Sequence, residues 1–503
     1  MRAQRYDAIV VGIGGMGSST LYQLARRGRR VLGLEKYDVP HSRGSSHGET
    51  RIIRLAYYED PSYVYLLRRA YELWREIQTR AGEQLLHITG SIDAGPPSSW
   101  VFKGSLQSCL EHDLPHEVLT SDELTQRYPA WKLPQETLAV HQPEGGFLLP
   151  ERCIVSFVQA AQAAGAQVHA REEVIDWEPI GDGVRVITDR ATYIADRLVI
   201  TAGAWNAHLL PFLDGLTIPE RQVLGWFQPQ RPELFGPDMF PVFNLLVDEG
   251  RFYGFPVHGI PGFKFGKYHH FEEAVDPETY DREPRLEDEL LLREFSSRYT
   301  PEGNGPTMSL ATCMFTNTPD KHFLIDVHPE FPQVSFASPC SGHGFKFASV
   351  MGEIMADLAD AGDTRHDIDL FRLHRFPVPL NARPSQGHAS TAQQRLVTPG
   401  VGRRRSDYDR GALPRRARLD DDAWPDRDAE GRRTASGRRA TAGRRNGFQV
   451  RPRPGAARDL RMGRPADRDR RSQGPSRDGR AAERLPWVSM VADEDTDAIR
   501  PFW

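Results

Sequence analysis

Four glycines near the N-terminus have the spacing that binds the pyrophosphate of a dinucleotide. They lie in the sequence Gly12-Ile13-Gly14-Gly15-Met16-Gly17. An apolar run at 6–11 precedes it and an amphipathic stretch at 18–27 follows it, which predicts a strand, a glycine turn and a helix. Gly12 permits the tight turn, Gly14 lets the backbone approach phosphates, and Gly17 lets the helix pack on the strand. We therefore predict a nucleotide whose phosphates face the helix N-terminus.

An acidic residue follows the second predicted strand of this unit. That strand, residues 30–34, ends in Glu35, which lies 23 residues after Gly12. A carboxylate at this position accepts hydrogen bonds from ribose hydroxyls and disfavours a 2′-phosphate. The nucleotide is therefore expected to be NAD or FAD rather than NADP.

Three later segments hold residues that could act around such a nucleotide. Residues 40–54 follow the second strand and are dense in Gly, Ser, His and Arg, so they lie where a bound cofactor would continue. Residues 341–349 form a second glycine-rich helix start, which could receive a ring system. Between them, Cys313 begins the segment 313–320.

These motifs, in this order, resemble the family of monomeric sarcosine oxidase and N-methyltryptophan oxidase. The resemblance covers residues 5–376 nearly continuously. It rests on the glycine turn and five further segments: Gly44–Arg54, Leu198–Trp205, Tyr253–Pro256, Cys313–Thr316 and Ser341–Lys346. Any one of them could be accidental, but six in order are specific.

The resemblance implies that the cofactor is FAD, bonded through a thioether to Cys313. A thiolate is a soft nucleophile that can attack a flavin methyl carbon. Arg51 matches a family residue beside the flavin ring, where positive charge stabilises the reduced anion. The other expected cofactor residues are Gly12, Gly14, Gly15, Gly17, Glu35, His47, Gly342, Gly344, Phe345 and Lys346.

The resemblance also assigns the residues that handle substrate. Arg54 and Lys346 are expected to bind a substrate carboxylate, since both are cations in loops distant in sequence. Lys264 is expected to face the flavin and to promote the reaction with oxygen, because a cation stabilises forming superoxide. Tyr253 and His343 match residues near the flavin and the substrate.

Each assignment has a plainer alternative, and two positions depart from the family pattern. Cys313 could be a buried apolar cysteine, and Lys264 a solvent-facing residue of a strand in which Phe263 and Phe265 point the other way. Phe315 stands where sarcosine oxidase has a tyrosine. Either Tyr268 or His269 could occupy the position of the family's active-site histidine.

The predicted function is oxidation of a secondary amine by an FAD enzyme. Demethylation of an N-methyl amino acid such as sarcosine or N-methyltryptophan, with oxygen as acceptor, would give formaldehyde, the demethylated amino acid and hydrogen peroxide. A flavin oxidase of cyclic imino acids such as proline or pipecolate would share every motif. The expected partners are the small amine substrate and oxygen, with no membrane, and the protein is expected to be a monomer.

Composition divides the 503-residue chain in two. Residues 377–503 hold 28 Arg and 17 acidic residues but no Lys, a net charge of +11, whereas the residues before them total −15. The tail contains too little apolar surface to offset the entropy of ordering, so we expect disorder. Its charge permits nucleic-acid binding, but the interspersed acids and the lack of a binding motif argue against it. Its lack of lysine also fits out-of-frame coding.

For residues 1–376 the alternation of apolar runs and amphipathic helices predicts an α/β fold. The resemblance implies a Rossmann-type FAD-binding domain at 1–85, 150–215 and 325–376, interleaved with a sheet-rich α+β substrate domain at 86–149 and 216–324. The four cysteines have no metal-ligand spacing, so no metal is expected. No signal peptide or membrane span is expected, which favours the cytoplasm.

Overall fold

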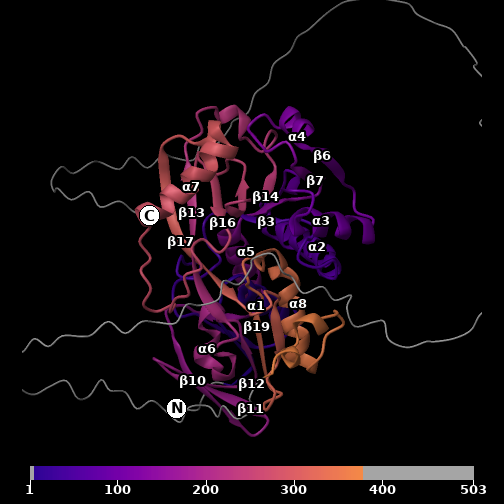
Figure 1. Ribbon diagram of the computed structural model, residues 1–503. Helices are drawn as coiled ribbons and strands as arrows, with labels where there is room; N and C mark the ends of the chain where they lie inside the picture. Colours follow the sequence, from indigo (N-terminus) through magenta and orange to yellow (C-terminus); the bar gives the residue numbers. More distant parts are fainter. Residues whose placement is uncertain (1–4, 378–503) are drawn as a thin grey trace, which may run out of the picture. The chain divides into compact units, whose positions relative to one another are not determined.

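The computed structural model describes residues 5–377 (Figure 1). Residues 378–503 lie outside this part, so the predicted disorder of the tail stays a prediction. Eight α-helices and nineteen strands occur within the described residues. The predicted α/β class is confirmed.

The first sheet contains the nucleotide-binding unit predicted from the glycine turn. Its order is β10-β11-β12-β1-β2-β9, and β19, which pairs with the end of β12, carries β18. The strands β9, β2, β1, β12 and β19 pair in parallel. The short apolar strands β1 and β2 are largely buried, as expected when helices cover both faces of a parallel sheet. The bounds are β1 Arg5–Val11, β2 Val31–Leu34, β9 Gln167–His169, β10 Val174–Ile180, β11 Gly183–Thr188, β12 Thr192–Ile200, β18 Leu324–Val327 and β19 Val334–Ser338.

Four helices pack around this sheet and one another (Figure 1). The predicted helix at 18–27 begins three residues earlier than expected, because the last glycines of the turn already have helical backbone. The bounds are α1 Gly15–Arg26, α2 Tyr63–Ala81, α5 Pro150–Ala163 and α8 Ala348–Ala361, with the short α6, Asn206–Leu209, after β12.

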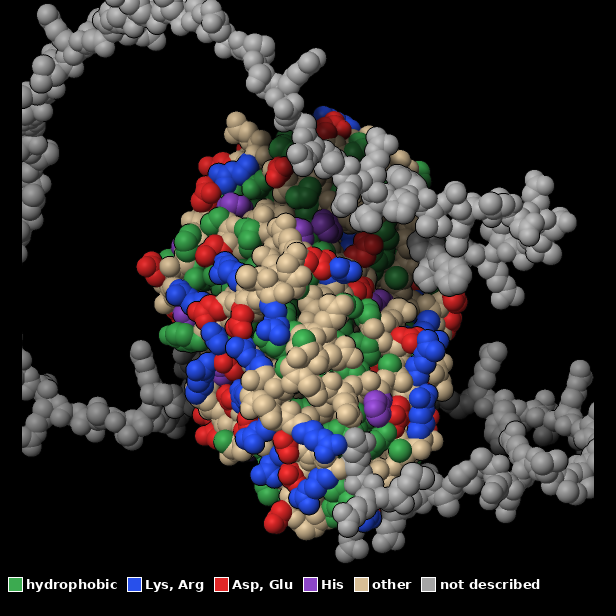
Figure 2. Space-filling model, turned by 180° about the vertical axis from the view of Figure 1, so that it is seen from behind, with side chains coloured by type: hydrophobic (Ala, Val, Ile, Leu, Met, Phe, Trp, Pro, Cys, Tyr) green, Lys and Arg blue, Asp and Glu red, His purple; other side chains and the backbone are tan. Residues whose placement is uncertain are grey.

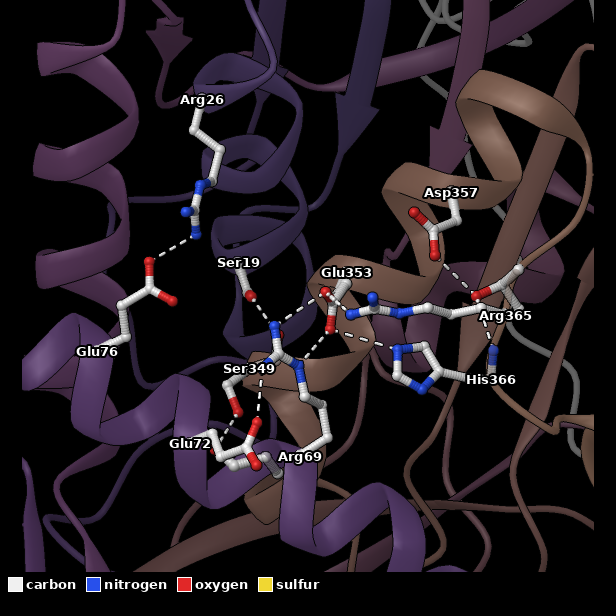
Figure 3. A network of polar contacts seen from close by, with 12 residues as sticks. Ser19, Arg26, Arg69, Glu72, Glu76, Ser349, Glu353, Asp357, Arg365 and His366 are labelled. Atoms are coloured by element: carbon white, nitrogen blue, oxygen red, sulfur yellow. Dashed lines mark hydrogen bonds and ion pairs between the residues drawn. The ribbon is translucent and has the colours of Figure 1, made fainter.

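Polar contacts connect α8 to α1 and to α2 (Figure 3). The Ser19 hydroxyl on α1 donates a hydrogen bond to the Ser349 carbonyl on α8, at 3.2 Å. Arg69 on α2 contacts both carboxylate oxygens of Glu353 on α8, at 2.9 and 3.1 Å. The backbone of α8 approaches α1 so closely that a Cβ on Gly352 would lie 2.1 Å from the Ser19 hydroxyl oxygen. This packing fixes the glycine-rich starts of α1 and α8 relative to each other.

The second sheet also has eight strands, in the order β17-β13-β16-β15-β14-β5-β7-β6. One face packs against an aromatic core that includes Phe263 and Phe265. The strand bounds are β5 Ser91–Gly95, β6 Glu117–Thr120, β7 Leu138–Gln142, β13 Ile218–Phe227, β14 Val242–Val247, β15 Gly250–Phe255, β16 Phe263–Lys267 and β17 Thr307–Asn317; the neighbouring helices are α3 Trp100–Glu111, α4 Ser121–Arg127 and α7 Leu286–Tyr299.

A small third sheet joins segments of the chain that are far apart in sequence. Its order is β3-β8-β4, with bounds β3 Arg51–Ile53, β8 Gly146–Leu148 and β4 Leu86–Ile88. Because β3 is paired with β8, the backbone that carries Arg51 and leads directly to Arg54 is fixed.

The strands that form each sheet come from interleaved segments. The first sheet takes strands from 5–34, 167–200 and 324–338, and the second from 91–142 and 218–317. Within the described residues no helix is long and apolar enough to cross a membrane. On the face drawn in Figure 2, basic and acidic side chains are intermixed.

Candidate active site

One cavity of about 600 Å³ brings most of the predicted site residues together. Its wall is formed by the glycine turn, the end of β2, the loop at 40–46, one face of the second sheet and the segment 339–346. The predicted residues that line it are Gly12, Gly14, Gly15, Glu35, Arg51, Tyr253, Cys313, Gly342, His343, Gly344, Phe345 and Lys346. Gly17, His47, Arg54 and Lys264 are not part of this wall.

The glycine turn forms a cradle that side chains would fill. Gly12 has φ +84°, and a Cβ there would lie 2.6 Å from the Thr201 carbonyl oxygen. A Cβ on Gly17 would lie 1.8 Å from the Gly12 carbonyl oxygen. A Cβ on Gly14, in contrast, would have no atom closer than the Ser46 hydroxyl oxygen, at 4.0 Å. No side chain caps the N-terminus of α1. The backbone N–H groups at this helix start therefore open toward the cavity, as a phosphate requires.

Glu35 holds the glycine turn from the end of β2. Its carboxylate is buried and accepts hydrogen bonds from the backbone N–H of Ile13 at 2.8 Å and of Tyr37 at 3.0 Å. His41 approaches it at 3.4 Å. The acid thus lines the cavity where the resemblance places the ribose, and its contact with ribose hydroxyls stays a prediction.

Arg51 and Cys313 meet in the cavity wall. Cys313 lies on β17 and is 4% exposed, and the Arg51 Nη2 donates to its Sγ at 3.7 Å. The same nitrogen donates to the Ser45 carbonyl at 2.7 Å, and Nη1 donates to the Thr50 carbonyl at 2.9 Å. The Arg51 guanidinium is therefore held against the Cys313 sulfur by two backbone carbonyls.

Lys264 is fixed behind the wall, next to Arg51. It is 3% exposed, and its Nζ donates to the Gly48 carbonyl at 2.5 Å and to the carbonyl and hydroxyl of Thr50 at 2.9 and 2.8 Å. Burial, and then the charge of Arg51, lower the pKa of Lys264 well below its usual value. The alternative of a solvent-facing lysine is therefore wrong, and the predicted alternation with Phe263 and Phe265 is confirmed.

His343 and Lys346 face the cavity from the segment before α8. The Nε2–H of His343 donates to the Lys321 carbonyl at 3.1 Å, so its Nδ1 accepts from the Tyr57 hydroxyl at 2.6 Å. Burial lowers the pKa of His343 to about 3, which keeps the ring neutral. The Lys346 Nζ donates to the His343 carbonyl at 2.8 Å. Burial, and then Arg54, lower the pKa of Lys346 to about 7.

Arg54 lies behind Lys346 in a buried cluster of charges. It is 1% exposed, donates to Glu59 at 2.8 Å and to the Ala56 carbonyl, and lies 3.7 Å from Asp93. Burial would raise the pKa of Glu59, but Arg54 and other cations lower it to about 2. Of the two cations predicted to bind the substrate carboxylate, Lys346 therefore lines the wall and Arg54 lies behind it.

His47 is buried and close to Arg51. Burial, and then Arg51, lower its pKa to about 3, and its Nε2 has no hydrogen-bond partner among the residues described. It does not line the cavity.

The structure decides one position that the sequence left open and adds two residues that the sequence reasoning missed. Tyr268, not His269, lines the cavity, because His269 turns away to contact Glu220 at 3.0 Å. Glu59 and Asp93 were not predicted. The sequence signal for Asp93 was a charge inside the strand-like run at 91–95, where a buried acid requires a partner.

Comparison with known proteins agrees with this geometry. Residues 7–358 match the family model for FAD dependent oxidoreductases. The chain belongs to this family, so its cofactor is FAD. Monomeric sarcosine oxidase from Streptomyces avermitilis is 43% identical over 377 residues, which are 74% of this chain and 98% of that protein.

Two further relatives extend the comparison. N-methyl-L-tryptophan oxidase from Yersinia pestis is 35% identical over 74% of this chain and 99% of its own length. A solved mutant of NikD, described as an unusual amino acid oxidase essential for nikkomycin biosynthesis, has a TM-score of 0.64 and 25% identity. It covers 73% of this chain and 96% of its own. Over nearly all of the described residues, the chain thus shares its fold with flavoenzymes that oxidise amines.

Proposed function

We propose that the protein is an FAD-dependent oxidase that demethylates N-methyl amino acids. The products are formaldehyde, the demethylated amino acid and hydrogen peroxide. The observation that carries this proposal is one cavity wall that joins a nucleotide cradle at Gly14 to Cys313, Arg51 and Lys346. The relatives at 35–43% identity are oxidases of sarcosine and N-methyl-L-tryptophan.

The buried charges near Lys346 support a carboxylate-bearing substrate. Among residues 5–377, Lys346 has one hydrogen-bonded partner, a carbonyl, whereas Arg54 already contacts Glu59 and lies close to Asp93. An incoming carboxylate would supply the counter-ion that Lys346 lacks and would raise its pKa. Arg54 would stabilise the same anion from behind, at longer range.

Cys313 is proposed to bond covalently to the flavin ring. Its thiol lies in the cavity wall and beside Arg51, where it could hold the flavin through a thioether at the ring's methyl carbon. The C–S bond would replace one methyl C–H bond and the S–H bond, and the two electrons released would pass into the flavin ring. All four cysteines are free, as such an attack requires. A reducing, cytoplasmic location and a monomeric state are part of the proposal.

The residues of this chain would orient the substrate and control charge. FAD, when bound, would supply a two-electron acceptor for a hydride from the carbon next to the amine nitrogen. Lys346 would hold the carboxylate, and the neutral His343 would line the adjoining wall without adding charge. Lys264, whose ammonium form is favoured by hydrogen bonds to the carbonyls of Gly48 and Thr50, would stabilise from behind the wall the negative charge that forms when oxygen is reduced. The segments 1–85, 150–215 and 325–376 would bind FAD and the segments 86–149 and 216–324 would cover the substrate.

Product analysis distinguishes this function from oxidation of cyclic imino acids. The purified protein would be supplied with sarcosine, N-methyl-L-tryptophan, L-proline and pipecolate, and peroxide and formaldehyde would be measured. Peroxide with formaldehyde supports demethylation, and peroxide only with the cyclic substrates overturns it. Acid denaturation then tests the bond: flavin retained by wild type and lost from Cys313→Ser supports attachment at Cys313, whereas release from wild type refutes it.

A further inference from the structure

Lys264 is held by one short loop, residues 48–50. Its Nζ donates hydrogen bonds to the Gly48 carbonyl at 2.5 Å and to the Thr50 carbonyl and hydroxyl at 2.9 and 2.8 Å. An ammonium group has three N–H donors, so the loop accepts all of them. Lys264 therefore has no donor left to offer to oxygen, and it can assist the oxygen reaction only through its positive charge.

The peptide unit between Gly48 and Glu49 is held from both sides. Its carbonyl faces Lys264, and its N–H, which belongs to Glu49, donates to the Glu151 carboxylate at 3.2 Å. The Gly48 N–H donates to the same carboxylate oxygen at 2.6 Å. Glu151 lies in the first turn of α5, so it reaches the loop from a helix. One peptide unit thus connects a carboxylate to an ammonium group.

The backbone of this loop needs such support. Gly48 has φ +92° and Glu49 has φ +69°. The left-handed region is unfavourable for a residue that has a Cβ, as Glu49 does. The two hydrogen bonds to Glu151 stabilise this conformation, which directs the Gly48 carbonyl toward Lys264.

The same loop leads directly into the cavity wall. Arg51 follows it, and the Nη1 of Arg51 donates to the Thr50 carbonyl at 2.9 Å, the oxygen that Lys264 also contacts. Arg51 lines the cavity and contacts the Cys313 sulfur at 3.7 Å. The Lys264 Nζ lies 4.3 Å from the ring centre of Phe255, which lines the cavity as well. The charge of Lys264 is therefore only one layer of side chains behind the wall.

Glu151 also supplies the negative charge that favours the ammonium form of Lys264. Burial and then Arg51 lower the pKa of Lys264, and Glu151 opposes them more strongly than any other group does. Further titratable groups that face Lys264 are Glu49, Cys313 and the neutral His47. Removal of the Glu151 carboxylate would leave the effects of burial and Arg51 less opposed, so less of the lysine would be charged.

We propose that Glu151 is a positioning residue for the oxygen reaction: its carboxylate holds the 48–49 peptide against Lys264 and keeps this lysine charged. The inference rests on the proposed function, which gives Lys264 its role with oxygen. In that reaction two electrons and two protons pass from the reduced flavin to oxygen and give hydrogen peroxide. Negative charge develops on oxygen as electrons arrive, and a cation behind the wall stabilises it. Glu151 is not among the residues that line the cavity, so it acts through Lys264 and not by contact with substrate.

The test measures flavin reoxidation in the flavin-loaded protein by stopped-flow absorbance, after reduction with dithionite, so that no amine substrate is needed. Glu151→Gln keeps an oxygen that can accept the two backbone N–H groups but removes the charge. The wild-type rate should fall as pH rises, because the ammonium form is lost above the pKa of Lys264. In Glu151→Gln the midpoint of this fall should lie about one pH unit lower, which slows reoxidation about tenfold above both midpoints. Flavin reduction by sarcosine, measured separately, should change less than about twofold.

Lys264→Met provides the background for a double-mutant cycle. In this background Glu151→Gln should have no further effect on reoxidation, because the cation through which it acts is gone. Glu83→Gln is the matched control, since Glu83 contacts Arg152, the residue after Glu151, at 2.6 Å. It should leave the reoxidation rate and its pH profile unchanged.

Three results would overturn the inference. Wild-type reoxidation rates in Glu151→Gln from pH 6 to pH 9 would show that the charge is not needed. Equal slowing by Glu151→Gln in the Lys264→Met background would show that Glu151 acts by another route. A Lys264→Met protein that reoxidises as fast as wild type would refute the role that the proposed function gives to Lys264, whatever Glu151→Gln does. If Glu151→Gln does not retain flavin, Glu151→Asp decides, since its shorter side chain must slow reoxidation more than reduction.

Discussion

Binding of a carboxylate should depend on pH through Lys346, because the fold lowers the pKa of this cavity cation to about 7. The ligand requires the ammonium form, which is present below this pKa and disappears as pH rises through it. Affinity should therefore be constant below pH 7 and fall about tenfold, or about 1.4 kcal/mol, for each pH unit above it. Between pH 7, where half of the Lys346 side chains are still protonated, and pH 9 the loss is about 50-fold.

Methoxyacetate is a suitable probe, since it has the shape of sarcosine but no ionisable amine. Its Kd would be measured from the change it causes in the flavin absorption spectrum, at intervals from pH 6 to pH 9. Lys346→Met should bind more weakly at pH 6, with little further loss at pH 9. Lys103→Met, which changes an exposed lysine of α3, should retain the wild-type profile. A wild-type Kd that does not change between pH 6 and pH 9 would refute the assignment of Lys346.

Three further predictions concern the cradle, the oxygen reaction and the fold. Gly17→Ala should abolish flavin binding, because its Cβ would lie 1.8 Å from the Gly12 carbonyl oxygen; yellow protein of normal yield would contradict this. Lys264→Met should slow flavin reoxidation far more than flavin reduction in stopped-flow experiments, and equal slowing would count against its role. Asp288→Asn should lower the free energy of unfolding by about 3–5 kcal/mol, because Arg221 loses a buried partner held at 2.7 Å; an unchanged urea midpoint would contradict this.

The nucleotide cradle could be predicted from sequence because its determinants are local. The glycine spacing, the apolar run before it and the acid after β2 lie within 35 residues, and each has a steric or hydrogen-bonding reason that needs no distant partner. The alternation around Lys264 is local too, since successive side chains of a strand point to opposite faces. The family motifs then named further residues, of which Cys313 and Lys346 do line the cavity.

Sequence alone left open which side chains meet in space. Whether Tyr268 or His269 faces the cavity depends on the turn after β16, where His269 adopts φ +54° and contacts Glu220 on β13. Local spacing also gave no sign that Arg54 is held behind Lys346 by Glu59 and Asp93.

The positions of Asp93, Asn244 and Arg251 show why tertiary structure was needed. These residues lie on β5, β14 and β15, and only the pairing of strands more than 140 residues apart in the chain puts them on one face. Local sequence therefore determined the nucleotide cradle and the direction of each strand's side chains. Strand register, which depends on packing across the whole sheet, decided which charges lie together and what they leave unpaired.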